Sequence, residues 1–210
     1  MKKKAFVTSR DASLVRFLDT HSNICMTANQ IASLFYADES KSEESAYKIA
    51  MRRLKILADS RYLKRQRDYS NEPFIFYSND SKKMKRSAHK SKMIDFLIHL
   101  KKAQIEVISV SFEYAELQLS HGLRPDMMVI CDSFGQRFAL FVEVDLTKEF
   151  NADAYRKVVR DSQHVRGIVG HTFGIVSVCD KRTDTDFSVI NIKTDFSNFN
   201  NLVWSLNSAK

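Results

Sequence analysis

Glycine, proline and cysteine are scarce in this chain of 210 residues, which holds five Gly, two Pro and three Cys. So few Gly and Pro residues leave little room for long irregular loops. The three cysteines, Cys25, Cys131 and Cys179, are widely spaced in apolar surroundings, so we expect buried free thiols and no zinc site. No apolar run approaches the roughly 18–20 residues of a membrane span, and we expect a cytoplasmic protein with no membrane insertion.

The positive charge is distributed unevenly along the chain. Residues 1–92 contain 20 Lys and Arg against 10 Asp and Glu, a net charge of +10. Residues 93–210 contain 13 against 15, a net charge of −2, and the two sums give the total of +8. A basic segment followed by a slightly acidic one predicts a polyanion-binding module joined to a domain with another task.

The apolar periodicity of the N-terminal segment predicts three helices. The first covers residues 11–21. The second and third each begin at a pair with capping-box spacing, Thr27 with Gln30 and Ser40 with Glu43. Such helices bury one apolar face and leave the other to solvent.

Two β-rich segments, 62–69 and 73–77, follow the third helix and predict a hairpin. Three helices and a hairpin predict a winged helix-turn-helix domain over residues 1–77, with double-stranded DNA as its partner. Basic residues gather on the third helix and the hairpin, the elements that contact DNA in this motif. The candidate DNA-binding residues are Tyr47, Lys48, Arg52, Arg53, Lys64, Arg65 and Arg67.

A polar, strongly basic connector spans residues 78–92. It fits either a plain solvated linker or a segment that neutralises phosphates. The second domain, residues 93–210, begins with a helix that starts near His89.

Strands dominate that second domain. They are expected over residues 106–110, 127–131, 137–144, 172–178 and 187–192. A helix over 152–165 separates the third strand from the fourth, and a last helix over 198–206 holds Trp204 as a core anchor. This order predicts an α/β sheet domain, and the whole chain is then of the α+β class.

Three carboxylates stand at the ends of two successive predicted strands. Asp126 opens one strand, and Glu143 and Asp145 lie near the end of the next. Residues i and i+2 of a strand point to the same face, so Glu143 and Asp145 project together. If the two strands form a hairpin around residues 132–136, Asp126 comes opposite them and the three carboxylates converge.

Carboxylates converge where a cation neutralises them, because like charges at about 4 Å repel in a low dielectric. We expect Mg²⁺ or Mn²⁺, which prefer oxygen ligands, bound by Asp126, Glu143 and Asp145. The apolar run 139–144 around Glu143 predicts a strand buried on both faces. The alternative is that Asp126 lies in a turn and the other two carboxylates lie on a solvated strand end.

This acidic pattern resembles a known nuclease motif. Pro125–Asp126, a strand, and then Glu143-Val144-Asp145 are similar to the PD-(D/E)xK motif of restriction-endonuclease-like nucleases. With the winged-helix start, residues 123–126 (LRPD) and 141–145 (FVEVD) resemble the replication-relaxation family and the related MobC-type plasmid relaxases. The resemblance covers nearly the whole chain as an order of elements, and the residue match is concentrated in 123–157.

The resemblance implies metal-dependent, strand-specific nicking of DNA at an origin of transfer. It also implies a coupling protein or other relaxosome proteins as partners. The family motif has Lys two residues after the Glu, where this chain has Asp145. Another lysine would have to supply that charge. Lys157 is the first candidate and Lys148 the second, although Lys157 can equally be a surface residue. The expected catalytic residues are Asp126, Glu143, Asp145 and Lys157.

Other groups near the motif have weaker patterns. His121 fits a general base or a turn residue, and Glu113 or Glu116 fits an additional acid. Tyr114 fits a covalent nucleophile. The chain has neither an HxH pair nor a GxxxxGK[ST] loop, which excludes the two-histidine site of common tyrosine relaxases and a phosphate loop of the ATPase type.

Three hypotheses follow for the activity. The first is a plasmid or mobile-element relaxase that nicks one DNA strand. The second is a non-catalytic relaxosome accessory protein or replication regulator with a degenerate nuclease core. The third is a restriction-type or repair endonuclease that cuts both strands.

Overall fold

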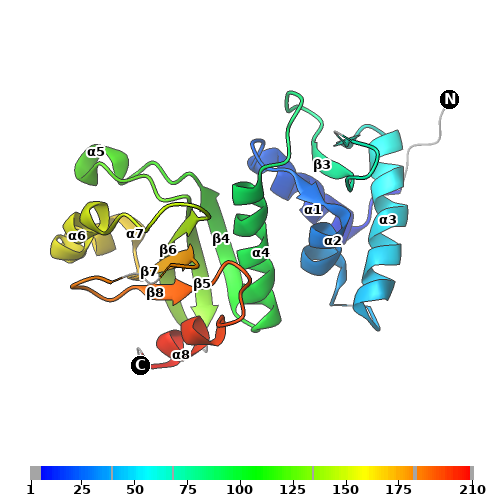
Figure 1. Ribbon diagram of the computed structural model, residues 1–210. Coiled ribbons are helices and arrows are strands. Elements are labelled where there is room, and N and C mark those ends of the chain that lie inside the picture. Colours follow the sequence, from blue (N-terminus) through cyan, green and yellow to red (C-terminus); the bar gives the residue numbers. More distant parts are fainter. Residues whose placement is uncertain (1–5, 39, 68, 134, 182–183, 209–210) are drawn as a thin grey trace. The chain divides into compact units, whose positions relative to one another are not determined.

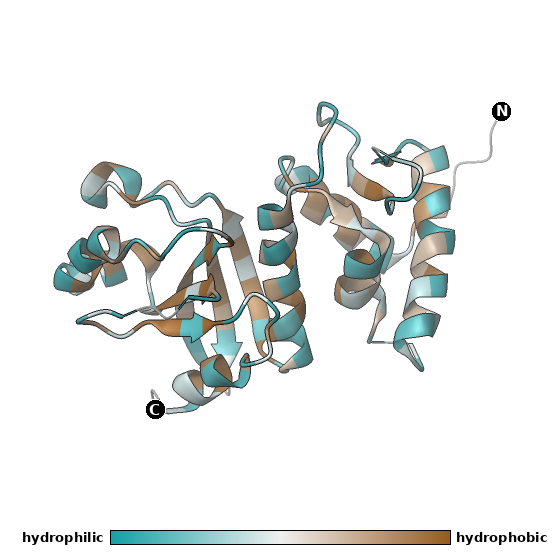
Figure 2. Cartoon of the chain, in the orientation of Figure 1, coloured by the Kyte–Doolittle hydropathy of each residue, from teal (hydrophilic) through white to brown (hydrophobic). Residues whose placement is uncertain are grey.

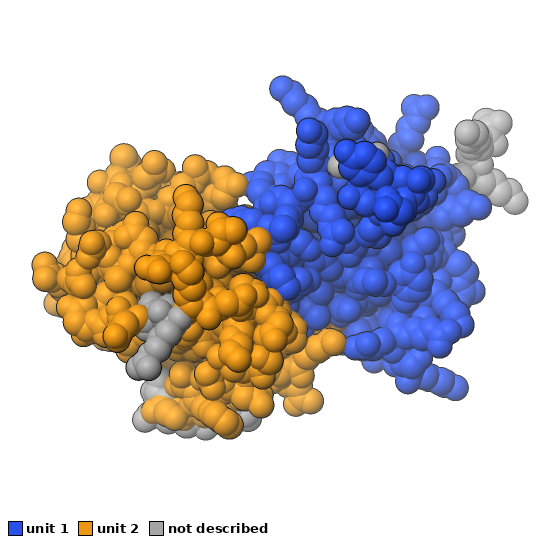
Figure 3. Space-filling model, in the orientation of Figure 1, with its two compact units in different colours: residues 1–98 blue, residues 99–210 orange. Residues whose placement is uncertain are grey.

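The computed structural model describes residues 6–38, 40–67, 69–133, 135–181 and 184–208, and it mixes helices with two sheets (Figure 1). The chain forms two compact units, Met1–Ile98 and His99–Lys210 (Figure 3). The boundary falls inside the helix expected to open the second domain. Among the described residues, no helix combines the length and apolar character that a membrane crossing requires.

Unit 1 contains a helical part and a small antiparallel sheet. Its elements are α1 (Ser9–Thr20), β1 (Met26–Thr27), α2 (Ala28–Ile31), the π-helix η1 (Ala32–Tyr36), α3 (Glu43–Asp59), β2 (Leu63–Gln66), β3 (Ile75–Ser78) and α4 (Ala88–Lys102), which extends into unit 2. The strand order in the sheet is β1-β3-β2. The three expected helices and the hairpin are therefore present.

Side-chain caps determine where the helices of unit 1 begin. The capping box of Thr27 and Gln30 is confirmed at α2. The expected box of Ser40 and Glu43 is wrong, because Ser42 caps α3 and accepts from the backbone N–H of Ser45. The hydroxyl of Ser40 donates to the carbonyl of Tyr36 instead, at 2.6 Å.

The inward face of α3 follows the predicted apolar pattern. Ala46, Ala50, Leu54 and Leu57 are buried, and Ile49 is half-buried. The spacing of three or four residues places these side chains on one side of the helix. The opposite side is left to the charged residues.

The first half of α4 is bonded to the rest of unit 1. The amide of Gln30 on α2 donates to the hydroxyl of Ser91 at 2.9 Å and to the carboxylate of Asp95 at 2.8 Å. Residues 88–92, part of the expected connector, lie at the start of this helix. The irregular part of the connector is therefore short, residues 79–87.

Unit 2 is built on a five-stranded sheet. Beyond the end of α4 its elements are β4 (Glu106–Phe112), α5 (Gln118–His121), β5 (Met127–Ser133), β6 (Gln136–Asp145), α6 (Ala152–Arg160), α7 (Ser162–Val169), β7 (Thr172–Cys179), β8 (Ile190–Ile192) and α8 (Asn200–Ser208). The strand order is β4-β5-β6-β7-β8. The first three strands pair antiparallel, and β7 and β8 continue parallel to β6.

The expected hairpin of β5 and β6 is confirmed, and β6 is the middle strand of the sheet. Phe141 and Val144 on β6 are buried, as predicted. Hydrophobic residues occupy most of the central strands because both faces of the sheet are covered (Figure 2). Glu143 thus lies on a central strand within an apolar setting.

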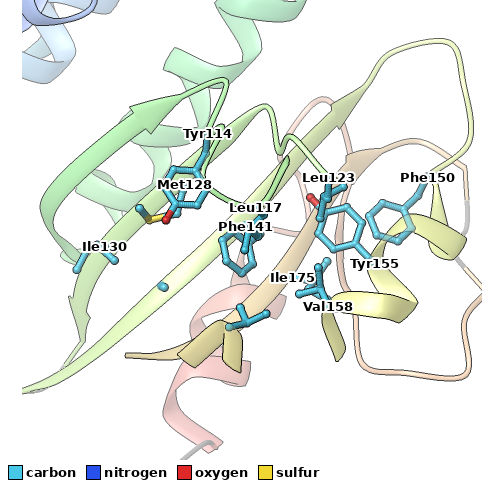
Figure 4. Close-up of a cluster of buried hydrophobic side chains, with 12 residues drawn as sticks. Tyr114, Leu117, Leu123, Met128, Ile130, Phe141, Phe150, Tyr155, Val158 and Ile175 are labelled. Carbon is cyan, nitrogen blue, oxygen red and sulfur yellow. The ribbon is translucent and has the colours of Figure 1, made fainter. Parts of the chain in front are cut away.

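One face of this sheet forms a core with α6 and α7 (Figure 4). Phe141, Ile175 and Met128 come from the strands, and Tyr155 and Val158 from α6.

The cysteines are buried and free, as expected.

Two expectations about the helices of unit 2 are wrong. The predicted helix 152–165 is two helices, α6 and α7, which join at Asp161 with a non-helical backbone (φ −100°, ψ 33°). Trp204 is 65% exposed and is not a core anchor. Leu202 and Leu206, one helical turn apart, form the buried face of α8, so the residue midway between them points outward.

Candidate functional site

Two carboxylates meet where β5 begins and β6 ends. Met127 pairs with Val142 in the antiparallel hairpin, so the residue before Met127, Asp126, lies opposite the residue after Val142, Glu143. One carboxylate oxygen of Asp126 accepts the backbone N–H of Val144 at 2.8 Å. The carboxyl groups of Asp126 and Glu143 also hydrogen-bond to each other. The alternative of a solvated turn and strand end does not describe this pair.

The surroundings of Glu143 disfavour its charged form. Burial raises the pKa of Glu143 to about 8, and the charge of Asp126 adds to this rise. The hydrogen bond with Asp126 acts in the same direction, because it favours a protonated Glu143 that donates to an ionised Asp126. The surroundings of Glu143 therefore favour its neutral form at neutral pH.

Tyr155 on α6 completes this pair from the helical side. Its hydroxyl donates to Glu143 Oε1 at 2.8 Å, and its ring stacks on Phe150 at 5.0 Å between centroids (Figure 4). Tyr155 is fully buried, and burial with the charge of Glu143 raises its pKa well above the usual value. Tyr155 therefore stays protonated and holds one oxygen of Glu143 in place.

Sequence reasoning missed Tyr155, although a signal was present. Val158 follows it by three residues, and both belong to the apolar face of α6. A tyrosine on a buried helical face needs a polar partner for its hydroxyl. Glu143, the half-buried acid on the strand before that helix, is this partner.

Asp145 lies two residues beyond Glu143 on the same strand, and its charge is the weakest of the named influences on the pKa of Glu143. Two residues of a strand span about 6.6 Å, which separates Asp145 from the pair. Within the described parts of the chain, no three His, Cys, Asp or Glu side chains lie where they could jointly hold a metal ion. The structure brings Asp126 and Glu143 opposite each other and places Asp145 two residues along the same strand as Glu143.

The two candidate lysines lie on the surface of unit 2. Lys157 follows Tyr155 by two residues on α6, which turns it about 200° around the helix from the side that reaches Glu143. Its side chain is exposed, as is that of Lys148. Lys157 thus has the exposed setting of a surface residue, the second of the two interpretations given above.

The weaker candidates have other contacts. His121 is buried at the end of α5, where its Nδ1 lies 2.7 Å from the hydroxyl of Ser120 and its Nε2 lies 3.3 Å from the carboxylate of Asp161. Tyr114 donates its hydroxyl to Glu116 at 2.7 Å. Ser120 thus engages one ring nitrogen of His121, and Glu116 engages the hydroxyl of Tyr114.

Glu113 directly follows β4 and is joined to Asp126 by a backbone hydrogen bond. Its N–H donates to the carbonyl of Asp126 at 2.7 Å, and its carboxylate forms an ion pair with Arg124 at 2.8 Å. It supports the strand end that carries Asp126.

In unit 1, the outer side of α3 is polar and exposed. Tyr47 is 39% exposed, and Lys48 and Arg52 are exposed along the same helix. Lys48 pairs with Glu44 at 2.5 Å, and Arg52 Nε donates to the carbonyl of Lys48 at 3.3 Å. These three predicted residues form one accessible surface.

Arg53 differs from this surface, because it lies over a buried carboxylate. Its guanidinium binds Asp11 on α1, with a shortest distance of 2.5 Å, and also donates to the carbonyl of Phe6. Tyr36 donates to the same carboxylate at 2.7 Å. Burial alone would raise the pKa of Asp11, but these hydrogen bonds outweigh it and lower the pKa to about 2. Arg53 is therefore a structural residue of unit 1.

The three predicted basic residues of the hairpin have two kinds of environment. The guanidinium groups of Arg65 and Arg67 lie 5.7 and 5.0 Å from the ring centroid of Phe74, and both side chains are exposed. Cation–π contacts of this kind orient an arginine without removing its charge from solvent. Lys64 is half-buried, and its ammonium donates to the carbonyl of Ser81 at 2.7 Å, which gives it a structural role.

Comparisons with models of protein families, with curated proteins and with solved structures gave no match.

Proposed function

We propose that this protein is a metal-dependent DNA nickase of the relaxase type, in which unit 1 binds duplex DNA and unit 2 cleaves one strand. The observation that carries the proposal is the pair of hydrogen-bonded carboxylates, Asp126 and Glu143, at the end of a central strand. A folded chain gains nothing in stability from two half-buried acids side by side. Such a pair is the usual mark of a functional site.

The element order of unit 2 supports a restriction-endonuclease-like domain. A helix leads into three antiparallel strands, and a helical segment then connects β6 to the parallel strand β7. The residues of the PD-(D/E)xK-like motif, Asp126 and Glu143, come from adjacent strands of this arrangement. This order of elements is what the resemblance described above leads us to expect, and it supports the proposal.

The element order of unit 1 supports a winged helix-turn-helix domain. α2 and α3 would form the helix-turn-helix, with α3 as the recognition helix in the major groove. The β2–β3 hairpin would be the wing, where Arg65 and Arg67 contact phosphates. Tyr47, Lys48 and Arg52 are the accessible residues of α3 for contact with DNA.

The donor set of the acidic site fits a hard divalent cation. Mg²⁺ commonly takes one or two carboxylates and completes its shell with water and substrate phosphates, and Mn²⁺ favours the same oxygen ligands. Asp126 and Glu143 would hold the ion. When bound, such an ion stabilises charge on a phosphate and lowers the pKa of water.

The protein's own groups would prepare this site. The backbone N–H of Val144 fixes one oxygen of Asp126, and Tyr155 fixes one oxygen of Glu143. Glu143 must give up its proton to bind a cation, because a protonated carboxyl is a poor ligand.

A specific observation favours a second candidate function, that of a non-catalytic DNA-binding accessory protein of a relaxosome or a replication regulator. Asp145 replaces the lysine of the motif, and the lysines considered as substitutes, Lys148 and Lys157, are exposed. In this case the acidic pair would be the remnant of a nuclease site. DNA binding by unit 1 would be unaffected.

The test is a cleavage assay on supercoiled plasmid that carries the DNA flanking the chain's own coding sequence. The full chain is incubated with MnCl₂, with MgCl₂ or with EDTA, and the products are separated on a gel. Open circles that need the metal support the nickase, and linear products would indicate the double-strand endonuclease instead. Uncut plasmid under all conditions, with DNA binding retained, would support the accessory protein.

A further inference from the structure

The short segment between β3 and α4, residues 79–87, is bonded to unit 1 along its length, and we call it the strap (Figure 1). The hydroxyl of Ser81 donates to the carbonyl of Ser22 at 2.7 Å. Lys64 donates to the carbonyl of Ser81, and the amide of Gln66 donates to the carbonyl of Met84 at 2.6 Å. Bonds from two neighbouring elements thus fix the backbone of the strap.

A cavity of about 630 Å³ opens between the strap, the turn after α1 and the start of α4. Four lysines line it: Lys82, Lys83 and Lys85 from the strap and Lys90 from α4. Two acids, Asp19 and Asp80, also line it, and Asp19 accepts the hydroxyl of Ser78 at 2.6 Å. Lys90 donates to the carbonyl of Asn23 at 3.0 Å. The cavity is therefore basic on balance.

The charge around this cavity is concentrated over a few residues. Residues 79–92 hold six Lys and Arg against one acid, Asp80. Lys82, Lys83 and Lys85 are exposed, so their ammonium groups reach solvent while the backbone beneath them is held. Positive charges at this density attract a polyanion. When they neutralise the phosphates of a nucleic acid, the counterions of that nucleic acid are released.

The lining indicates which polyanion fits. Lysine ammonium groups act as point charges for phosphate and do not select a base. None of the described residues that line the cavity is aromatic, so the cavity offers no stacking surface for the base of a free nucleotide. Serines and a backbone held open to solvent suit a sugar-phosphate chain better than an enclosed small molecule.

We propose that the strap cavity is a nucleic-acid backbone site, which binds phosphates of duplex DNA through Lys82, Lys83 and Lys85. These three lysines lie outside α3 and outside the strands of the hairpin. It rests on the proposed function only in that the protein binds DNA. It adds affinity and salt dependence, and it carries no sequence selectivity.

The test compares two triple variants of the full chain with equal loss of charge. The strap variant is K82Q/K83Q/K85Q, and the control is R137Q/R166Q/K193Q, whose residues are exposed in unit 2. Binding to a short labelled duplex of arbitrary sequence is measured by fluorescence anisotropy at several NaCl concentrations. The slope of log K against log salt should fall by about two to three in the strap variant, since each phosphate contact contributes about 0.9. Its affinity should fall about tenfold or more at low salt, and the control should keep the wild-type slope.

Three outcomes overturn the inference, and they are distinguishable. Wild-type protein that does not bind DNA at low salt contradicts the proposed function itself. If wild-type protein binds and both variants match its slope, or both lose the same amount, the strap has no specific role. The thermal unfolding temperature of the wild-type protein and of the strap variant is also measured with inorganic pyrophosphate, to test whether the cavity binds a small phosphorylated ligand. A stabilisation that the strap variant loses, with DNA binding unchanged, would assign the cavity to a small phosphorylated ligand.

Discussion

Unit 1 and unit 2 each withdraw a carboxyl group from solvent, and they treat it in opposite ways. Asp11 receives hydrogen bonds from Arg53, Tyr36 and Thr8, and its pKa is lowered to about 2. Glu143 faces the carboxylate of Asp126 and receives a bond from Tyr155, and its pKa is raised to about 8. The first acid is stabilised as an anion, and the second as a neutral acid.

This contrast is the one expected between a structural carboxylate and the metal site that we propose. A buried carboxylate with a guanidinium and a hydroxyl as partners stabilises the fold, because its charge is compensated. Two carboxyl groups that face each other disfavour the state in which both are charged, and folded proteins often retain this arrangement where a ligand uses it. Substitutions should therefore have opposite effects in the two units.

The largest expected effect concerns cleavage in unit 2. Asp126→Asn and Glu143→Gln should each reduce nicking by about 10³-fold or more, because each removes a negatively charged ligand from the pair. Both variants should unfold at a temperature equal to or above that of the wild type, since each removes a repulsion. Glu149→Gln, an exposed acid after the same strand, serves as the control and should nick normally. Normal nicking by both pair variants would contradict the nickase.

The next effect concerns stability in unit 1. Arg53→Gln should destabilise the protein by about 3 kcal/mol, because it leaves the buried charge of Asp11 without its cation. The neighbouring substitution Arg52→Gln should change stability by less than about 0.5 kcal/mol and should weaken DNA binding instead. Urea unfolding and anisotropy measure the two effects. Equal stabilities for the two variants would remove the distinction between a structural and a DNA-contacting arginine.

The two acids should also give opposite pH dependences. The folded-state pKa of Glu143 lies above its unfolded value of 4.5, so stability should fall as pH rises from about 5 to 8, by on the order of 2 kcal/mol. The folded-state pKa of Asp11 lies below its unfolded value of 3.8, so its contribution is present above pH 4 and is lost as pH falls towards 2.

Unfolding curves of the wild type and of E143Q across this pH range measure the difference. The decline between pH 5 and 8 should be smaller in E143Q, and the loss at acid pH should remain. A decline of the same size in both proteins would show that another group is responsible.

The smallest effect is expected at Tyr155, which acts through Glu143. Tyr155→Phe keeps the ring but removes the hydroxyl, and should cost about 1 kcal/mol. Because its hydrogen bond lowers the pKa of Glu143, the variant should shift the midpoint of the stability decline to higher pH. Nicking should fall about tenfold. An unchanged midpoint would leave Tyr155 as a packing residue only.

Local patterns in the sequence predicted much of the fold. The helix 43–59, the capping box of Thr27 and Gln30, and the hairpin of β5 and β6 follow from periodicity and side-chain chemistry within short segments. The i, i+2 rule and the register placed Asp126 opposite Glu143 correctly. These features depend on neighbours along the chain or across one turn.

The remaining features depend on partners that are distant in sequence. The partner of Arg53 is 42 residues away, so its pattern could not be told from that of exposed Arg52. Lys64 was assigned to DNA for the same reason. The prediction that Trp204 is a core residue is wrong. Its position midway between the buried Leu202 and Leu206 places it on the opposite side of α8.

Calorimetric titration of MnCl₂ into the full chain at pH 8 tests the central claim most directly. The Asp126–Glu143 pair should bind about one ion per chain, with little or no binding in the double variant D126N/E143Q and unchanged binding in E149Q. Absence of binding by the wild-type protein, or equal binding by the double variant, would contradict the assignment of this pair as a metal site.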